Sequence, residues 1–332
     1  MKHANIAIFV PHNGCPHQCS FCNQRSITGK LTQPSPQNVV DAVQIAKESL
    51  LDNTKNAEIA FFGGSFTAIE RDYMVSLLDA ATPFVKDGTF AGIRISTRPD
   101  YIDDDILILL KKYGVTAIEL GAQSMDDRVL RMNQRGHTEK QVEAAAKLIK
   151  SYGFTLGLQM MTGLYGDTAE GSYQTARKLA ALHPENIRIY PTIIMRGTKL
   201  GDRYLRGEYQ TLNLEETVQL CAKLLDFFEE QGIRVIRLGL HSSPELERDM
   251  LSGPWHPAFR ELCESARMLH KITGCLQQNP PRKSSIIIKV NPKTVSKATG
   301  QKKSNLIALS KLGYSVKILR DSGVRENCFT IE

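Results

Sequence analysis

The chain has 332 residues, of which 42% are hydrophobic and 23% are charged, values typical of a globular protein with a substantial core. No apolar run approaches the roughly 18 residues that a membrane-spanning helix needs, and residues 1–5 lack the apolar segment of a secretory signal peptide. We therefore expect no membrane segment and a cytoplasmic location, where cysteines stay reduced.

The formal net charge of +7 is unevenly distributed. Residues 281–332 contain eleven Lys or Arg and three Asp or Glu, a net charge of +8, so the rest of the chain is close to neutral. A basic block of this kind is typical of a segment that contacts a polyanion, above all nucleic acid. The alternative is a solvated surface that only keeps the protein soluble.

The first predicted strand, residues 6–10, leads into three closely spaced cysteines in a C-x3-C-x2-C pattern, Cys15, Cys19 and Cys22. Thiols this close together converge on one centre when the chain loops around it. A [4Fe–4S] cluster takes four thiolates, and this loop supplies three, since the other four cysteines are scattered. The pattern therefore predicts a cluster with one iron open for chemistry, by analogy with the open position of catalytic zinc sites.

Two other interpretations are a zinc site that uses His12 or His17, and three reduced cysteines. Neither histidine lies at a familiar zinc spacing from the cysteines. With Phe21 directly before the last cysteine, the pattern resembles the signature of the radical S-adenosylmethionine (SAM) superfamily. This resemblance implies a [4Fe–4S] cluster on Cys15, Cys19 and Cys22, with SAM bound at the iron that has no protein ligand.

Short apolar runs alternate with amphipathic segments after the cysteine loop. The predicted strands are residues 58–62, 93–96, 117–120, 155–161, 187–190 and 235–238, and the predicted helices are residues 33–51, 71–85, 103–112, 139–152, 168–182 and 214–231. This alternation predicts right-handed βαβ units and a parallel sheet. Because no G-x-G-x-x-G dinucleotide fingerprint is present, we expect an α/β fold with a partial TIM-type (βα)6 barrel.

Three regions are expected along the chain. Residues 1–240 form the barrel, residues 241–280 a helical extension, and residues 281–332 a small basic α/β tail that begins in a proline-rich linker. In barrels of this kind the active site lies at the carboxyl ends of the strands. The unusual polar and glycine-rich stretches of the barrel region fall at those ends.

Gly63 and Gly64 directly follow the second predicted strand. A residue without Cβ lets a ligand touch the main chain. In the radical SAM superfamily a similar glycine motif approaches the methionyl amino group of SAM, and Ser65 stands at its third position here. The alternative for these glycines is an ordinary turn.

Five motifs resemble, in order and at similar intervals, the branch of the superfamily that contains the catalytic subunit of Elongator: residues 63–67, 97–101, 119–124, 133–138 and 189–198. The resemblance covers residues 5–240. It implies a radical SAM barrel that acts on the wobble uridine of tRNA and builds a carboxymethyl group from acetyl-CoA. Residues 240–332 contain no acetyltransferase domain and no acetyl-CoA pyrophosphate loop, which makes acetyl-CoA a doubtful co-substrate and leaves the product open.

The same resemblance implies the residues that contact SAM. Ser96 and Gln123 would contact its ribose, Gln159 would be a further polar group on the ribose side, and Arg135 would pair with its carboxylate through a guanidinium fork. The structural alternatives are a fold-stabilising role for Ser96 and Gln159 and a loop salt bridge for Arg135. Glu119, within a predicted strand, is either part of this site or a buried ion-pair partner.

The basic tail supports an RNA partner. Residues 300–303 and the helix and strand after them resemble the loop–helix–strand of a KH domain, in which a glycine loop clamps the nucleotide backbone, although the second glycine of that loop is missing. The lysines that we expect to contact phosphate are Lys297, Lys302, Lys303 and Lys311.

The expected function is reductive cleavage of SAM to a 5′-deoxyadenosyl radical. RNA, in particular tRNA, is the expected molecule modified, and ferredoxin or flavodoxin is the expected reductant. Two alternatives stay open. The first is a radical SAM enzyme that acts on a small molecule or a peptide. The second is an RNA-binding protein whose cluster is structural or senses redox state.

Overall fold

The computed structural model describes residues 3–11, 19–23 and 32–332 of the chain. They form two compact units. The barrel unit comprises Met1–Leu212 and Gln231–Pro254, and the C-terminal unit comprises Asn213–Glu230 and Trp255–Glu332. No helix in the described part of the chain is long and apolar enough to cross a membrane.

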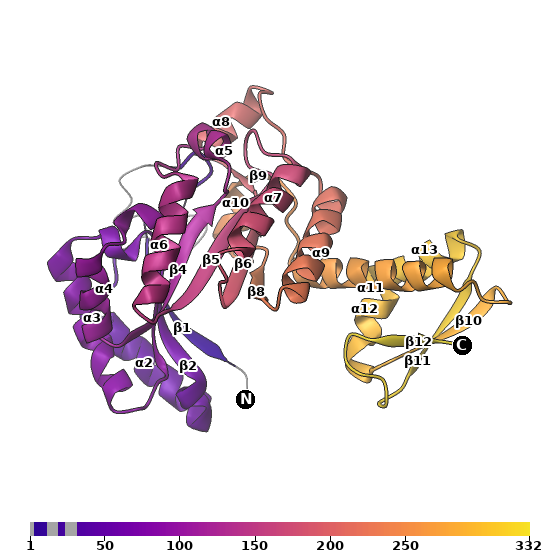
Figure 1. Ribbon diagram of the computed structural model, residues 1–332, viewed down its shortest axis with the longest axis horizontal. Helices are drawn as coiled ribbons and strands as arrows, with labels where there is room; N and C mark the ends of the chain where they lie inside the picture. The colour runs from indigo at the N-terminus through magenta and orange to yellow at the C-terminus, as the bar shows by residue number, and fades with distance from the viewer. Residues whose placement is uncertain (1–2, 12–18, 24–31) are drawn as a thin grey trace. The chain divides into compact units, whose positions relative to one another are not determined.

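The barrel unit is built on one seven-stranded parallel sheet in the order β1-β2-β3-β4-β5-β6-β8 (Figure 1). The strands are β1 (Ala4–Val10), β2 (Ala57–Gly63), β3 (Gly92–Thr97), β4 (Val115–Gln123), β5 (Thr155–Thr162), β6 (Asn186–Pro191) and β8 (Arg234–Leu238). Each strand pairs with the next parallel strand along the chain, and the sheet stays open between β8 and β1. The predicted partial barrel is confirmed.

Helices lie between successive strands and cover one face of the sheet (Figure 1). They are α2 (Pro36–Leu50), α3 (Arg71–Lys86), α4 (Asp104–Lys112), α6 (Glu139–Ser151) and α7 (Ala169–Ala180), with 3-10 turns η1 (Leu51–Asn56), η2 (Phe66–Ala68) and η3 (Pro99–Tyr101). Side-chain caps start several of them: Ser35 caps α2, Asp103 caps α4 and Thr138 caps α6. The central strands are buried on both faces, as parallel strands are.

Shorter elements surround the carboxyl ends of the strands. They are the helices α5 (Asp127–Met132), α8 (Lys199–Leu205) and α10 (Pro244–Asp249), and a small antiparallel pair of β7 (Ile194–Met195) with β9 (Met250–Ser252). Helix α10 lies within residues 241–280, which were predicted as a helical extension. The sequence pattern did not predict the other four elements, because segments of two to seven residues show no clear period.

The C-terminal unit combines two long helices with a three-stranded sheet. Helix α9 (Leu214–Glu230) packs on α11 (Phe259–Gln278), and the sheet has the order β11-β10-β12, with β10 parallel to β11 and antiparallel to β12. Its elements are β10 (Ser285–Val290), η4 (Pro292–Thr294), α12 (Val295–Thr299), η5 (Gln301–Lys303), α13 (Ser304–Lys311), β11 (Ser315–Arg320) and β12 (Phe329–Ile331). Buried apolar side chains of α11, β10, α12 and α13 form its core.

Candidate functional site

The described part of the cysteine loop is a tight turn that is fastened to two distant segments. Cys22 donates its backbone N–H to the carbonyl of Cys19 over 3.2 Å, and Cys19 is buried. Ser20 binds Asn133 twice, from its backbone N at 3.1 Å and from Oγ at 2.9 Å, and its carbonyl accepts from the backbone of Leu200. The turn is therefore held in place by the chain after α5 and by the start of α8.

Two of the three predicted cluster ligands can be placed. Cys19 and Cys22 stand on this turn, and Cys15 lies outside the described residues. Phe21, between them, packs against the apolar cluster of Ile194, Leu200 and Tyr209. Among the described residues no three His, Cys, Asp or Glu side chains converge as a metal site, so the test of the predicted cluster rests on what surrounds Cys19.

The Arg135 side chain reaches the cysteine turn. Its Nη1 donates to Sγ of Cys19 over 3.0 Å and its Nη2 donates to the carbonyl of Gly121 over 2.6 Å, while its Nε is buried without a partner. The hydrogen bond positions the Cys19 sulfur from the side of the guanidinium. The position of Arg135 at a SAM carboxylate stays a prediction.

Gln123 ends β4 in a strained backbone conformation next to Arg135. Its φ is +66°, in the left-handed region that residues other than glycine rarely adopt. A Cβ on Gly121 would lie 3.0 Å from Nε2 of Gln123 and 3.4 Å from Nη2 of Arg135, so the three residues meet. Oε1 of Gln123 is buried without a partner. Orphaned polar atoms on Gln123 and Arg135, beside a buried cysteine, fit a site for a polar ligand and a thiolate-bound cluster.

The predicted glycine motif joins the ends of β1 and β2. Gly63 has a φ of +117°, and a Cβ there would lie 2.8 Å from the carbonyl oxygen of Val10. Gly64 donates its N–H to the same carbonyl over 2.9 Å. The absence of a side chain at Gly63 therefore lets the strand that leads to the cysteines approach β2 closely.

The sequence motifs interlock through buried hydrogen bonds at this edge of the sheet. Ser65 and Thr97 share a hydroxyl contact of 2.8 Å, and Ser65 also accepts from the backbone of Arg98. Nε2 of His137 contacts the carbonyl of Ala122 at 3.2 Å, and burial, followed by the charge of Arg135, lowers the pKa of His137 to about 3. These bonds join the motifs at residues 63–67 and 97–101 to each other and those at 119–124 and 133–138 to each other, and Arg135 of the last motif contacts the cysteine turn.

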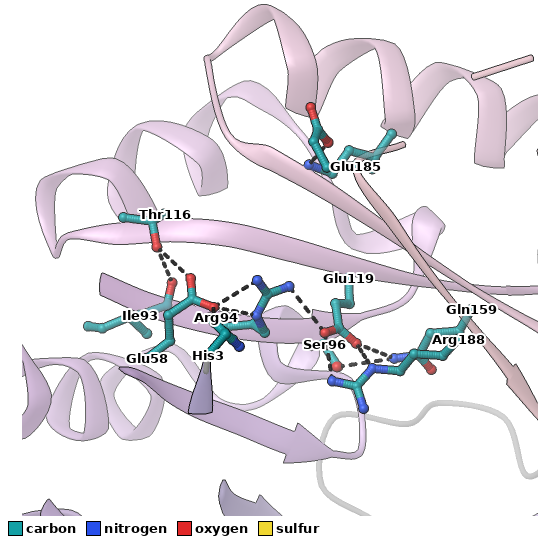
Figure 2. Close-up of polar contacts among 11 residues, drawn as sticks. His3, Glu58, Ile93, Arg94, Ser96, Thr116, Glu119, Gln159, Glu185 and Arg188 are labelled. Carbon is teal, nitrogen blue, oxygen red and sulfur yellow. Dashed lines mark hydrogen bonds and ion pairs between the residues drawn. The ribbon is translucent and has the colours of Figure 1, made fainter. Parts of the chain in front are cut away.

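Ser96 and Gln159 belong to a chain of buried charges that crosses the sheet (Figure 2). Gln159 donates from Nε2 to Glu119 over 3.0 Å and to Ser96 over 3.3 Å. Glu119 is fully buried and pairs with Arg94 and Arg188, at 3.2 Å and 2.6 Å. The buried ion pair that was an alternative for Glu119 is present.

The chain of charges continues toward the N-terminus. Arg94 pairs with Glu58 over 2.7 Å, and Glu58 also binds His3 over 2.8 Å. Burial raises the pKa of Glu58, yet Arg94 and His3 outweigh it and hold the pKa below its usual value. Sequence reasoning missed Glu58, Arg94 and Arg188, although the signal was present: each is the one charged residue amid apolar neighbours in its strand.

The four predicted RNA-binding lysines lie in different environments. Lys302 and Lys303 are exposed, with φ of +51° and +63°, and Lys311 is exposed at the end of α13. Nζ of Lys297, in contrast, donates to Asn327 over 2.7 Å and to Glu264 over 3.3 Å.

Two family models match the chain. The radical SAM superfamily matches residues 9–179, more than half of the chain, and the radical SAM C-terminal domain matches residues 184–269. Enzymes of this superfamily use a [4Fe–4S] cluster and SAM.

Curated relatives include proteins of the Elongator branch. An uncharacterized protein of Methanocaldococcus jannaschii, MJ0486, is 27% identical over 80% of this chain and 83% of its own length. The tRNA uridine(34) acetyltransferase of the same organism is 24% identical over 66% of this chain and 48% of its length. Elongator complex protein 3 of Homo sapiens is 31% identical over 51% of this chain. The chain covers 34% of that human protein. It therefore spans less than half the length of the tRNA uridine(34) acetyltransferase and of Elongator complex protein 3.

Solved structures show the same fold. The archaeal Elp3 of Methanocaldococcus infernus superposes with a TM-score of 0.59 at 19% identity, over 82% of this chain and 63% of that one. SuiB of Streptococcus suis bound to S-adenosylmethionine superposes with a TM-score of 0.50 at 12% identity, over 73% of this chain and 48% of that one. These likenesses show the fold, and the family model that matches more than half of the chain shows that the chain belongs to the radical SAM superfamily.

Proposed function

We propose that this chain cleaves SAM reductively and uses the resulting radical to modify RNA, with tRNA as the substrate. The observation that carries the first half is the meeting of Cys19, Arg135 and Gln123 at the carboxyl ends of the strands. When bound, the cluster and SAM supply a 5′-deoxyadenosyl radical that abstracts a hydrogen atom from the substrate.

The chain's own residues would hold and shield these groups. Cys15, Cys19 and Cys22 would hold three of the four irons, and Arg135 would stabilise the Cys19 thiolate through its short hydrogen bond. The buried Oε1 of Gln123 would accept a hydrogen bond from SAM. The paired charges on Glu58, Glu119 and their arginines would keep one face of the sheet rigid, because each charge is already neutralised.

RNA as the substrate is supported by the relatives and by charge. A curated relative is named a tRNA uridine(34) acetyltransferase, and residues 281–332 carry a net charge of +8. Because the chain spans 48% of that relative, neither acetyl transfer nor acetyl-CoA forms part of the proposal. Reduction would come from a low-potential donor such as ferredoxin or flavodoxin in the cytoplasm.

The test is an anaerobic assay of 5′-deoxyadenosine. The cluster is reconstituted, SAM and dithionite are added, and 5′-deoxyadenosine is quantified under three conditions. These are no nucleic acid, bulk tRNA, and heparin, a polyanion without nucleobases. Cleavage that tRNA stimulates and heparin does not would support both halves of the proposal. Cleavage indifferent to tRNA would refute the RNA substrate and direct the search to small molecules or peptides. If a protein with a complete cluster did not cleave SAM, the proposed enzymatic activity would be refuted.

A further inference from the structure

A loop between two short helices stands out in the C-terminal unit. Strand β10 is followed by α12 and α13 and then by β11, which pairs with β10 in parallel (Figure 1). Residues 300–303 connect the two helices. The sequence predicted a loop before one helix, and the structure adds a helix, α12, on the other side of that loop.

The connecting loop has a built conformation. Gly300, Lys302 and Lys303 all have positive φ, at +74°, +51° and +63°. A Cβ on Gly300 would collide with the side chain of Ser304 and would lie 2.8 Å from the backbone N of Asn305. The buried Asn305 donates from Nδ2 to the carbonyls of Lys297 and Ser265, at 2.9 Å each, which ties α13 to α12 and α11. Two lysines held in an unfavourable backbone region are typical of a functional constraint.

A cleft of about 500 Å³ opens beside this loop. Part of its lining is apolar, from Leu262 and Val295. Hydrogen-bond donors and acceptors come from Glu261, Ser296, Gln301 and Arg320. Nε2 of Gln301, a residue that lines the cleft, lies 3.3 Å from Nε2 of His256, and this contact orients the amide. The volume lies in the range of small-ligand sites, and apolar side chains beside hydrogen-bonding groups suit a nucleobase.

Ion pairs hold only part of the positive charge of the unit. Elsewhere in the unit Lys289 pairs with Glu332, Lys293 with Glu326 and Lys297 with Glu264. In the part of the chain that the structure describes, no ion pair involves Lys302, Lys303 or Arg320. Two exposed lysines therefore follow directly after Gly300 and Gln301, which line a cleft large enough for a nucleobase.

We propose that this cleft binds one unpaired nucleotide of an RNA strand, with its base in the cleft and the flanking phosphates on Lys302 and Lys303. The inference rests on the proposed RNA substrate and adds the place where the strand is held. A base-paired duplex does not fit, because its base edges are already paired and stacked. The lysines supply affinity through counterion release, and the cleft supplies the preference for unpaired bases.

The test measures binding to the full-length, cluster-loaded protein without reductant. The probe is a short unstructured RNA oligonucleotide with a fluorescent label, and its anisotropy is followed over a range of salt concentrations. The Lys302→Ala/Lys303→Ala variant should bind at least tenfold more weakly, and its log–log salt slope should fall by about 1.4, since each phosphate contact on a single strand contributes about 0.7. Lys289→Ala/Lys293→Ala is the matched control, because it removes the same charge from lysines that are already paired.

A cleft-filling variant separates a nucleotide site from a general basic surface. Ser296 is exposed and lines the cleft, so Ser296→Phe should weaken binding of unpaired RNA several-fold and leave heparin binding unchanged. The fluorescence of Trp255, the single tryptophan of the chain and the neighbour of His256, should change on RNA binding in the unmodified protein and in the Lys289→Ala/Lys293→Ala control. Thermal melts confirm that each variant is folded.

Three results would overturn the inference. They are equal binding of unpaired RNA, duplex RNA and heparin; an unaffected Ser296→Phe variant; and a preference for anionic lipid vesicles over RNA. None of these measurements involves SAM cleavage. A negative result for nucleotide binding in the cleft is therefore distinguishable from a negative result for the proposed enzymatic activity.

Discussion

Arg135 donates a hydrogen bond from Nη1 to Sγ of Cys19 over 3.0 Å, although the two residues are 116 positions apart in the chain. The carbonyl of Gly121 holds the other guanidinium nitrogen over 2.6 Å, so the arginine is positioned from both sides. A buried cation at a cluster thiolate stabilises the added negative charge when the cluster is reduced.

Replacing Arg135 should therefore make the cluster harder to reduce. A hydrogen bond to a charged group contributes about 1.4 kcal/mol or more, and for a one-electron couple that corresponds to a potential lower by about 60 mV. The measurement is a potentiometric titration of the reconstituted Arg135→Gln variant, followed by its paramagnetic resonance signal. Arg128→Gln is the control, because Arg128 is an exposed arginine that binds the carbonyl of Gly166. Equal potentials in the two variants would contradict the assigned role.

Cys19→Ala should remove the cluster. The remaining two cysteines of the pattern cannot replace a buried thiolate that Arg135 positions. Iron and acid-labile sulfide per chain should fall to background after anaerobic reconstitution, and 5′-deoxyadenosine should not form. Cys328→Ser, at an exposed cysteine of the C-terminal unit, should keep both properties. A Cys19→Ala protein with full iron content would exclude Cys19 as a ligand.

Glu119→Gln should destabilise the barrel unit strongly. The change leaves Arg94 and Arg188 buried without their shared carboxylate, and breaking a buried ion pair on one side costs about 3–5 kcal/mol. Chemical denaturation should show a lower midpoint at an unchanged slope.

Glu208 offers a matched control for Glu119. It also pairs with two arginines, Arg203 and Arg206, but Glu208 and Arg206 are exposed to solvent and Arg203 is only half-buried. Glu208→Gln should therefore leave the midpoint unchanged, since water and salt screen exposed pairs. Equal destabilisation by both substitutions would show that burial is not the cause.

His137 should make the protein less stable in acid. Burial, with the charge of Arg135 as the next cause, lowers its pKa to about 3 in the folded state, against 6.5 for an unperturbed histidine. Between pH 6.5 and pH 3 the unfolded chain binds a proton that the folded chain does not, so the free energy of unfolding falls as pH falls. The slope from this group is at most about 1.4 kcal/mol per pH unit.

The measurement is the free energy of unfolding as a function of pH for the unmodified protein and for His137→Gln. Glutamine keeps a polar side chain that can bind the carbonyl of Ala122 but does not titrate. The variant should lose part of the slope between pH 6.5 and pH 3 and none above it. Parallel curves over this range would contradict a buried neutral histidine.

The pattern of residues along the chain determined the class of fold, the order of its seven main strands and the superfamily. The short apolar runs at residues 93–96 and 187–190 are local signals, and each of these two is a strand whose bounds lie within one residue of the prediction. The cysteine pattern and the glycine motif are also local signals, because each is recognised from the spacing of a few neighbouring residues.

Only the tertiary structure decided which of these residues meet. No local signal in the sequence pairs Arg135 with Cys19, Glu119 with Arg94 and Arg188, or β7 with β9, because each contact joins segments that lie far apart in the chain. Likewise, the sequence showed lysines at 302 and 303, and the packing of α12, α13 and α11 placed them beside a cleft. Propensity and spacing act over a few residues, whereas sites arise where parallel strands and the loops after them are brought to a common edge.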